Sequence, residues 1–153
     1  GGTADALWRV KDLLKERFLV LNGDDIYAVE DIQACVAQKD WAVLVERVQG
    51  PRAGGKVVLD AEGCVTGILE GEHEGNLLLN TNTFILDTRL FAKPPVPKAP
   101  GSSEYGLPQT VLSTSRPLGI PFVAVPATRW IQITAPEDIA RAEGKLTRTD
   151  PHA

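Results

Sequence analysis

The segment Phe18–Asp25, which reads Phe-Leu-Val-Leu-Asn-Gly-Asp-Asp, constrains the fold of this chain more than any other segment. Its four apolar residues are followed at once by Asn22 and Gly23, so the run is short, as in a β-strand that is buried on both faces. Such strands occur in α/β folds, where ligands bind at the carboxyl ends of the strands. Asp24 and Asp25 follow such an end. Two interpretations are open: the carboxylates bind Mg²⁺ beside phosphate and water oxygens, or they form a turn and cap the next helix.

The rest of the chain alternates between patterns that are typical of helices and of strands. Helices are expected over 4–17, 29–39, 104–113 and 134–145, with Thr3 as the cap of the first and Thr134-Ala-Pro-Glu137 as a capping box for the last. Strands are expected over 18–21, 41–48, 77–86, 122–125 and 130–133. Residues 56–60 and 64–70 form a predicted β-hairpin whose turn is Glu62-Gly63. This order predicts an α/β fold with a hairpin insertion, in one domain over 1–146 with a C-terminal tail over 147–153.

Composition limits the classes of partner. The 153 residues suffice for one sizeable core, and a net charge of −4 without a long basic run argues against nucleic acid. Cys35 and Cys64 are too few for a disulfide framework, so we expect free thiols in a reducing compartment. Because no apolar run reaches about 18 residues and no signal peptide is visible, we expect a cytoplasmic protein without membrane contact.

Two other polar features admit a binding role and a structural role. Asn80 lies within an otherwise apolar predicted strand, where its amide finds either ligand hydroxyl groups or a structural hydrogen bond. Gly2 and Thr3 precede a predicted helix, whose first backbone N–H groups are open to an anion or a nucleobase. The alternative for this pair is an ordinary helix cap.

The order of these segments resembles the sugar-1-phosphate nucleotidylyltransferases, which make nucleotide sugars from a nucleoside triphosphate and a sugar-1-phosphate. The resemblance spans nearly the whole chain, although no single motif is decisive. It implies a Rossmann-like nucleotidyltransferase sheet with helices on both faces. The matching segments are Gly2–Ala4, Asn22–Asp24, Gly55–Asp60, Gly63–Glu70, Asn80–Asn82, Asp87–Phe91, Glu104–Leu107 and Trp130–Asp138.

The resemblance also implies the contacts that a ligand makes with this chain. Mg²⁺ is the implied cofactor, and the bound partner is a nucleotide or a nucleotide sugar. The family reaction is attack of the sugar phosphate on the nucleotide α-phosphate with release of pyrophosphate, and it relies on alignment and charge neutralisation. We therefore assign no catalytic side chain. The implied contacts are Asp24 and Gln132 for the metal, Gly2, Thr3 and Gly23 for the nucleotide, and Gly55, Glu70 and Asn80 for the sugar.

The sequence departs from the family pattern at several points. The family's first strand and its G-x-G-x-R loop are not seen, Gln132 stands where the family has an acid, Gly71 replaces a lysine, and Asn82 replaces a glycine. We therefore expect a sheet that is missing the first strand and no transferase activity from this chain alone. An N-terminal segment or a homo-oligomer is expected to complete the sheet, and the lack of methionine favours a segment upstream of residue 1. The alternatives are a non-catalytic nucleotide-sugar-binding or regulatory module and a structural remnant that only oligomerises.

Overall fold

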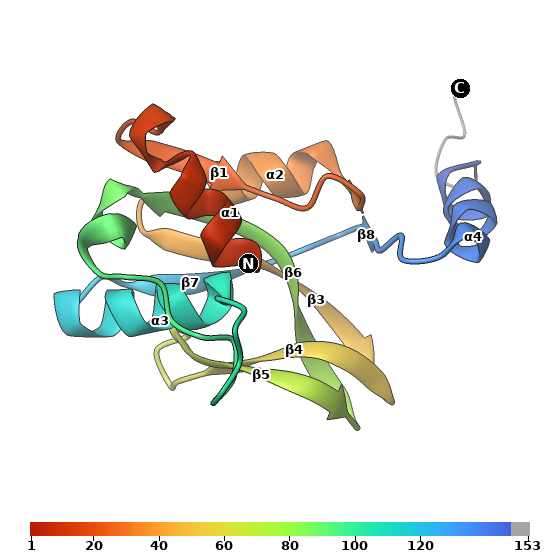
Figure 1. The fold of residues 1–153 in the computed structure, drawn as a ribbon. Helices are drawn as coiled ribbons and strands as arrows, with labels where there is room; N and C mark the ends of the chain where they lie inside the picture. Colours follow the sequence, from red (N-terminus) through yellow and green to blue (C-terminus); the bar gives the residue numbers. More distant parts are fainter. Residues whose placement is uncertain (148–153) are drawn as a thin grey trace.

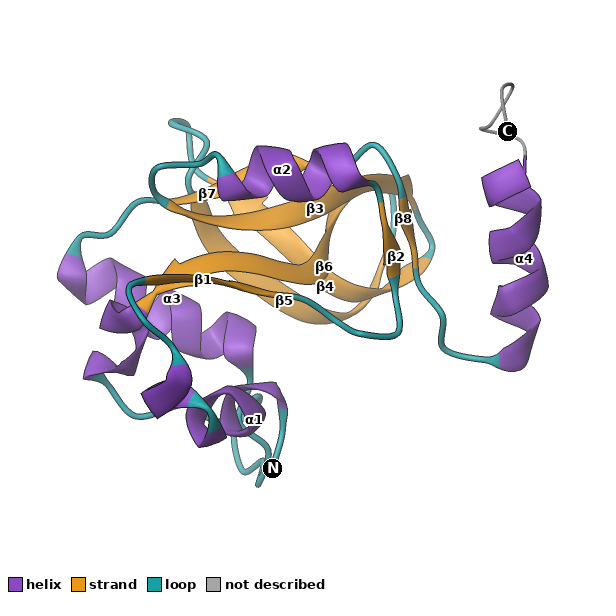
Figure 2. Ribbon diagram, turned by 90° about the horizontal axis from the view of Figure 1, so that it is seen from above, coloured by secondary structure: helices purple, strands orange, loops and turns teal. Residues whose placement is uncertain are grey.

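A computed structural model describes residues 1–147 and places a mixed β-sheet between helices (Figures 1 and 2). The strands of this sheet are β1 (Arg17–Val20), β3 (Trp41–Gln49), β4 (Arg52–Leu59), β5 (Val65–His73), β6 (Asn76–Asp87) and β7 (Phe122–Pro126). The short strands β2 (Ile26–Tyr27) and β8 (Trp130–Ile131) form a separate pair. The helices are α1 (Thr3–Arg9), α2 (Val29–Val36), α3 (Leu107–Leu118) and α4 (Pro136–Thr147), with 3₁₀ turns at Lys11–Leu13 and Thr88–Ala92.

The long strand β6 organises the sheet. Strand β3 pairs along one edge of β6, while β4 and β1 share its other edge, and all three are antiparallel to it. Strand β7 is parallel to β3 at the far side, and β5 pairs with β4 to complete the order β5-β4-β6-β3-β7. Within residues 1–147, β1 pairs only with β6, so its second edge is open. An open edge beside β1 agrees with a sheet that is missing a strand.

Alternating side chains of β3 divide the core between the two faces of the sheet. Trp41, Val43 and Val45 belong to the larger cluster, which includes buried residues of α1 and α3. Ala42 and Leu44 belong to a second cluster that includes Cys35 of α2. The prediction of an α/β fold with helices on both faces is therefore confirmed.

Both cysteines are free thiols, as predicted. Burial raises the pKa of the Cys35 thiol to about 11, so this sulfur is a core atom rather than a thiolate at neutral pH. None of the helices within residues 1–147 is long and apolar enough to cross a membrane.

The first predicted helix is too long. Helix α1 ends at Arg9, and the chain then turns through Val10 and a 3₁₀ turn before entering β1. The prediction of Thr3 as its cap was also wrong, because Gly2 occupies the N-cap position. The Thr3 hydroxyl instead accepts a hydrogen bond of 2.9 Å from the N–H of Leu107, the first residue of α3. The Thr3 side chain therefore links α1 to the start of α3 instead of capping its own helix.

The other boundaries differ by a few residues. Helix α2 ends at Val36, and α3 starts at Leu107 and runs to Leu118, where Gly119 adopts a left-handed conformation. The predicted hairpin is confirmed as β4–β5, with longer strands than expected. At the start of α4, the carboxylate of Asp138, not that of Glu137, accepts hydrogen bonds from the N–H and hydroxyl groups of Thr134.

Helix α4 stands apart from the main sheet (Figure 2). It runs to Thr147, one residue into the segment predicted as a tail, and residues 148–153 of that tail lie outside the described residues.

Candidate functional site

Two cavities contain half of the eight predicted site residues. The first, which we call the α3 pocket, has a volume of about 180 Å³ and lies where α1 and α3 meet β5 and β6. Its lining includes Gly2, Thr3, Glu70, Asn82, Lys98 and Gln109. The second, which we call the α4 cleft, has a volume of about 460 Å³ and contains Gln132. Two predicted nucleotide contacts, Gly2 and Thr3, and one predicted sugar contact, Glu70, therefore line the first cavity, and one predicted metal contact, Gln132, lies in the second.

The three residues predicted to hold the sugar are neighbours. Gly55 of β4 pairs directly with Glu70 of β5, and a Cβ atom at Gly55 would lie 3.2 Å from Oε1 of Glu70 and 3.4 Å from Cβ of Asn80. The same Cβ would lie only 2.9 Å from Cγ2 of Ile68, so glycine is required for this close approach. The absence of a side chain at Gly55 lets Glu70 lie beside Asn80.

The amide of Asn80 has partners within the protein. Its Oδ1 accepts a hydrogen bond of 2.8 Å from the N–H of Asn82, and its Nδ2 donates one of 2.8 Å to Oδ1 of Asn82. Asn82 has φ of 57°, a left-handed conformation that asparagine tolerates better than most residues. This explains how asparagine can stand where the family has glycine. The structural interpretation of Asn80 thus has a geometric basis, and its contact with a sugar stays a prediction.

Gly2 and Thr3 join α1 to the start of α3. Gly2 has φ of 102°, and a Cβ atom there would lie 2.5 Å from the carbonyl oxygen of Tyr105. The N–H of Ala4, which was expected to be open to a ligand, donates a hydrogen bond of 3.1 Å to that same carbonyl. Both residues therefore build the wall of the α3 pocket, and their contact with a nucleotide stays a prediction.

The two adjacent aspartates have different roles in the structure. Asp25 accepts hydrogen bonds from Nε1 of Trp130 at 3.0 Å and from the N–H of Ile133 at 3.2 Å, which fix the loop after β1 against β8. Asp24 is exposed, and no hydrogen bond or ion pair of its side chain is seen within residues 1–147. Gly23 is also exposed, with open space around it. The structural interpretation therefore applies to Asp25, while Asp24 is available to a ligand.

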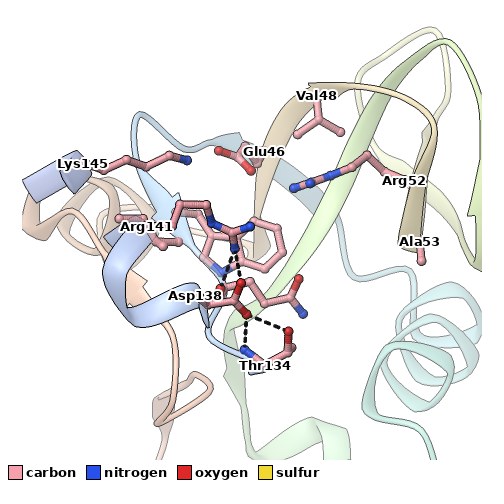
Figure 3. Close-up of a pocket in the computed structure, with 11 residues that line it drawn as sticks. Glu46, Val48, Arg52, Ala53, Thr134, Asp138, Arg141 and Lys145 are labelled. Atoms are coloured by element: carbon pink, nitrogen blue, oxygen red, sulfur yellow. Dashed lines mark hydrogen bonds and ion pairs between the residues drawn. The ribbon is translucent and has the colours of Figure 1, made fainter. Parts of the chain in front are cut away.

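The α4 cleft lies between the β3–β4 strands and α4. Figure 3 shows Lys145, Glu46 and Arg52 pointing toward one another across it. Burial raises the pKa of the Glu46 carboxyl, and the positive charges of Lys145 and Arg52 act in the opposite direction. Arg141 forms an ion pair of 2.9 Å with Asp138 inside the cleft.

Comparison with known proteins identifies the fold. Over 91 residues the chain is 34% identical to the bifunctional protein GlmU of Methanocaldococcus jannaschii, a match that covers 59% of this chain and 22% of GlmU. The crystal structure of HddC from Yersinia pseudotuberculosis superposes with a TM-score of 0.70 and 21% identity over 95% of this chain. A candidate glucose-1-phosphate thymidylyltransferase from Bacillus anthracis superposes with a TM-score of 0.71 and 21% identity over 97% of this chain. No protein-family model matches the chain.

The chain has the nucleotidyltransferase fold. The predicted resemblance is thereby confirmed for the fold, and the GlmU match adds homology over 91 residues. The chain spans 62% of the length of each of the two solved structures and 22% of the length of GlmU.

The resemblance to the nucleotidylyltransferases implies a metal site, and the residues present can supply only a few of the ligands of a metal ion. No group of three or more Asp, Glu, His or Cys side chains that could hold a metal ion occurs within residues 1–147. Asp24 can supply one carboxylate and Gln132 one amide oxygen, and the contacts of Asp25 with Trp130 and Ile133 hold their two segments together. Mg²⁺ is commonly bound by one or two carboxylates and takes its other ligands from water and substrate phosphates. Asp24 and Gln132 therefore suit an ion such as Mg²⁺, which takes most of its ligands from water and phosphate oxygens.

Sequence reasoning missed several residues of these cavities. Gln109 and Lys98 line the α3 pocket, while Arg52 and Arg141 line the α4 cleft. The predicted helix over 104–113 placed Gln109 in a helix interior, whereas it occupies the first turn of α3. The signal that could have identified Gln109 is its position two residues after the matching segment Glu104–Leu107.

Proposed function

We propose that this chain forms the sugar-binding and metal-binding side of a sugar-1-phosphate nucleotidylyltransferase site and that it binds a nucleotide or a nucleotide sugar. The α3 pocket carries the proposal, because Gly2 and Thr3 from one end of the chain line it together with Glu70 from the β4–β5 hairpin. The reaction of such a site is NTP plus sugar-1-phosphate to nucleotide sugar plus pyrophosphate. Its chemistry requires alignment of the two substrates and neutralisation of phosphate charge.

The solved neighbours support this ligand class. HddC has been crystallised with GMP-PN, and the Bacillus anthracis protein with sucrose, so relatives with this fold have been seen with a nucleotide and with a carbohydrate. A volume of about 180 Å³ holds roughly six water molecules, since each occupies about 30 Å³ of liquid. The α3 pocket thus accommodates a monosaccharide better than a whole nucleotide sugar, and the phosphates would extend toward Asp24.

In this proposal Asp24 and Gln132 hold Mg²⁺. The ion supplies positive charge that stabilises the phosphoryl oxygens. The chain's own contribution is positional, because Asp25 fixes the loop that carries Asp24 against the segment that carries Gln132.

Replacement of Glu70 by glutamine tests the sugar contact. We expect the affinity for nucleotide sugars to fall by roughly 10- to 100-fold, since a hydrogen bond to a charged group contributes about 1.5–3 kcal/mol. Isothermal titration calorimetry with UDP-glucose, dTDP-glucose and GDP-mannose measures the change. Glu62→Gln, an exposed substitution in the hairpin turn, is the matched control and should bind as the unaltered chain does. Equal affinity of the Glu70 variant would place the sugar elsewhere.

A binding module without turnover is the second candidate function. Two replacements favour it: Gln132 stands where the family has an acid, and Gly71 stands where the family has a lysine. Gln132 removes a negative charge from the proposed metal site, and Gly71 removes a positive charge beside Glu70. Pyrophosphate release from nucleoside triphosphates with a panel of sugar-1-phosphates decides between the two candidates: release that Asp24→Ala abolishes establishes the transferase, and nucleotide-sugar binding without release establishes the module.

We further propose that another β-strand, from an N-terminal segment or from a second copy of the chain, pairs with the open edge of β1. Val20 and Leu21 line an apolar cavity of about 300 Å³ together with Val10, and Leu21 is 43% exposed. An open edge beside exposed apolar side chains is a site of strand pairing.

Substitution of Leu21 by lysine tests pairing between copies. We expect the unaltered chain to sediment as a dimer or larger species at high concentration and Leu21→Lys to sediment as a monomer, because a lysine beside an edge strand opposes pairing. Leu118→Lys is the control, since Leu118 is similarly exposed, at 46%, but lies at the end of α3. A monomeric unaltered chain would exclude the second copy and leave the N-terminal segment as the proposed partner.

A further inference from the structure

Gln109 is a polar side chain of the α3 pocket whose buried oxygen has no partner. Its Oε1 is inaccessible to solvent and makes no hydrogen bond within residues 1–147. A buried amide oxygen without a donor is costly, and native structures rarely retain one without a reason. The side chain also lines the α3 pocket, so a bound molecule can reach the amide.

The N–H groups at the start of α3 that a glutamine at this position could cap already have other acceptors. Gln109 is the third residue of α3, the position from which a glutamine side chain can reach back to the N–H of the N-cap residue. Here the N–H of Gly106, the N-cap residue, donates to the carbonyl of Val96 at 3.1 Å. The next N–H, that of Leu107, donates to the hydroxyl of Thr3 at 2.9 Å. Because both donors are satisfied, Gln109 does not cap the helix.

The neighbouring glycine leaves room for the Gln109 amide. A Cβ atom at Gly106 would lie 1.8 Å from Oε1 and 2.8 Å from Cδ of Gln109, so any other residue at 106 would displace the amide. In its present orientation Oε1 faces Gly106 rather than a hydrogen-bond donor. The terminal torsion of a glutamine side chain is broad, so rotation about it exchanges Oε1 and Nε2 and can present either the acceptor or the donors of the amide to a ligand.

The other polar groups of the α3 pocket suit a ligand that carries several hydroxyl groups. Glu70 offers carboxylate oxygens, and Asn82, whose Oδ1 accepts from Asn80, leaves its own Nδ2 available as a donor. A glutamine amide adds one acceptor and two donors. Vicinal hydroxyl groups, which both donate and accept, match such a set.

We infer that Gln109 is a specificity-determining residue of the α3 pocket and that its amide binds hydroxyl groups of a monosaccharide unit. This inference rests on the proposed function, because it takes the sugar of a nucleotide sugar as the occupant of the pocket. Gln109 lies outside the segments that carry the family resemblance, so the inference adds a new contact to the proposed sugar site.

The substitution Gln109→Leu separates a ligand contact from a structural role. We expect affinity for UDP-glucose, dTDP-glucose and GDP-mannose to fall at least tenfold, while affinity for UDP, dTDP and GDP stays unchanged. We also expect the Tm of the free protein to be retained or raised, because the variant removes an unsatisfied buried oxygen. Calorimetric titration and thermal unfolding of the full chain measure the two quantities.

Controls make each outcome decisive. Gln33→Leu, an exposed substitution on α2, should change neither quantity. If Gln109→Leu does not fold, Gln109→Met repeats the test with an unbranched side chain of similar length. Equal binding of nucleotide sugars by the variant and the unaltered chain, or an equal loss for sugars and diphosphates, would overturn the inference and leave the proposed function standing. An unaltered chain that binds no member of the panel would overturn both.

Discussion

Replacement of Asp31 by alanine is expected to lower the free energy of unfolding by about 3–5 kcal/mol, a large part of the stability of a domain of this size. The Asp31 carboxylate is 2% exposed and accepts hydrogen bonds from the N–H and hydroxyl groups of Thr128, both at 2.8 Å, and from the N–H of Arg129 at 3.0 Å. Alanine would remove the acceptor of all three. A hydrogen bond to a charged group contributes about 1.5–3 kcal/mol, and because Thr128 is exposed we expect the total for the three bonds to lie near the lower end of their sum.

Urea unfolding measures the decrease in the free energy of unfolding. The rate at which a thiol reagent labels Cys35 provides an independent measure of opening. Because that thiol is buried and its pKa is raised to about 11, a thiol reagent should label it only after the protein opens. Labelling of Cys35 should therefore accelerate in Asp31→Ala. The control is Glu30→Ala, which removes an exposed carboxylate from the same turn of α2. Equal stability of the two variants would contradict a structural role for Asp31.

The Asp31 contacts also show which parts of this molecule a sequence can predict. The hairpin β4–β5 and the strands β3 and β6 follow from short apolar runs and a Gly-containing turn, since these patterns depend on residues that are close in sequence. Asp31 has the pattern of a solvated acid in the first turn of a helix. Its hydrogen-bond partners are 97 and 98 residues away, and no local sequence pattern predicts them.

The same reasoning applies to the site. Thr3 was expected to cap its own helix but binds the N–H of Leu107, which is 104 residues away. The role of Gln109 depends on the start of α3 at Leu107 and on acceptors from distant segments, such as the Val96 carbonyl, which no local sequence pattern indicates. In contrast, the family resemblance named Gly55, Glu70 and Asn80 together, and the register of the β4–β5 hairpin explains why Gly55 lies beside Glu70.

The adjacent residues Asp24 and Asp25 should respond to substitution in opposite ways. Asp24→Ala is expected to weaken nucleotide-sugar binding in the presence of Mg²⁺ by about 100-fold, roughly 3 kcal/mol, because it removes the carboxylate that we propose for the ion. Tm should not change, since the Asp24 side chain is exposed and has no hydrogen bond within residues 1–147. Asp25→Ala should lower Tm, because Nε1 of Trp130 and the N–H of Ile133 lose their acceptor.

Chelation of the metal separates the Asp24 effect from a general disturbance of the site. With EDTA in place of Mg²⁺, the unaltered chain should bind nucleotide sugars as weakly as Asp24→Ala, and the variant should lose little more. Asp12→Ala, an exposed carboxylate outside both cavities, is the control for the change in net charge. If Asp24→Ala and the unaltered chain respond equally to Mg²⁺, the ion is held by other oxygens and the pairing of Asp24 with Gln132 is wrong. A Mg²⁺-dependent difference that appears only for ligands with phosphate groups would place the ion between Asp24 and those phosphates, as the sparse protein donor set requires.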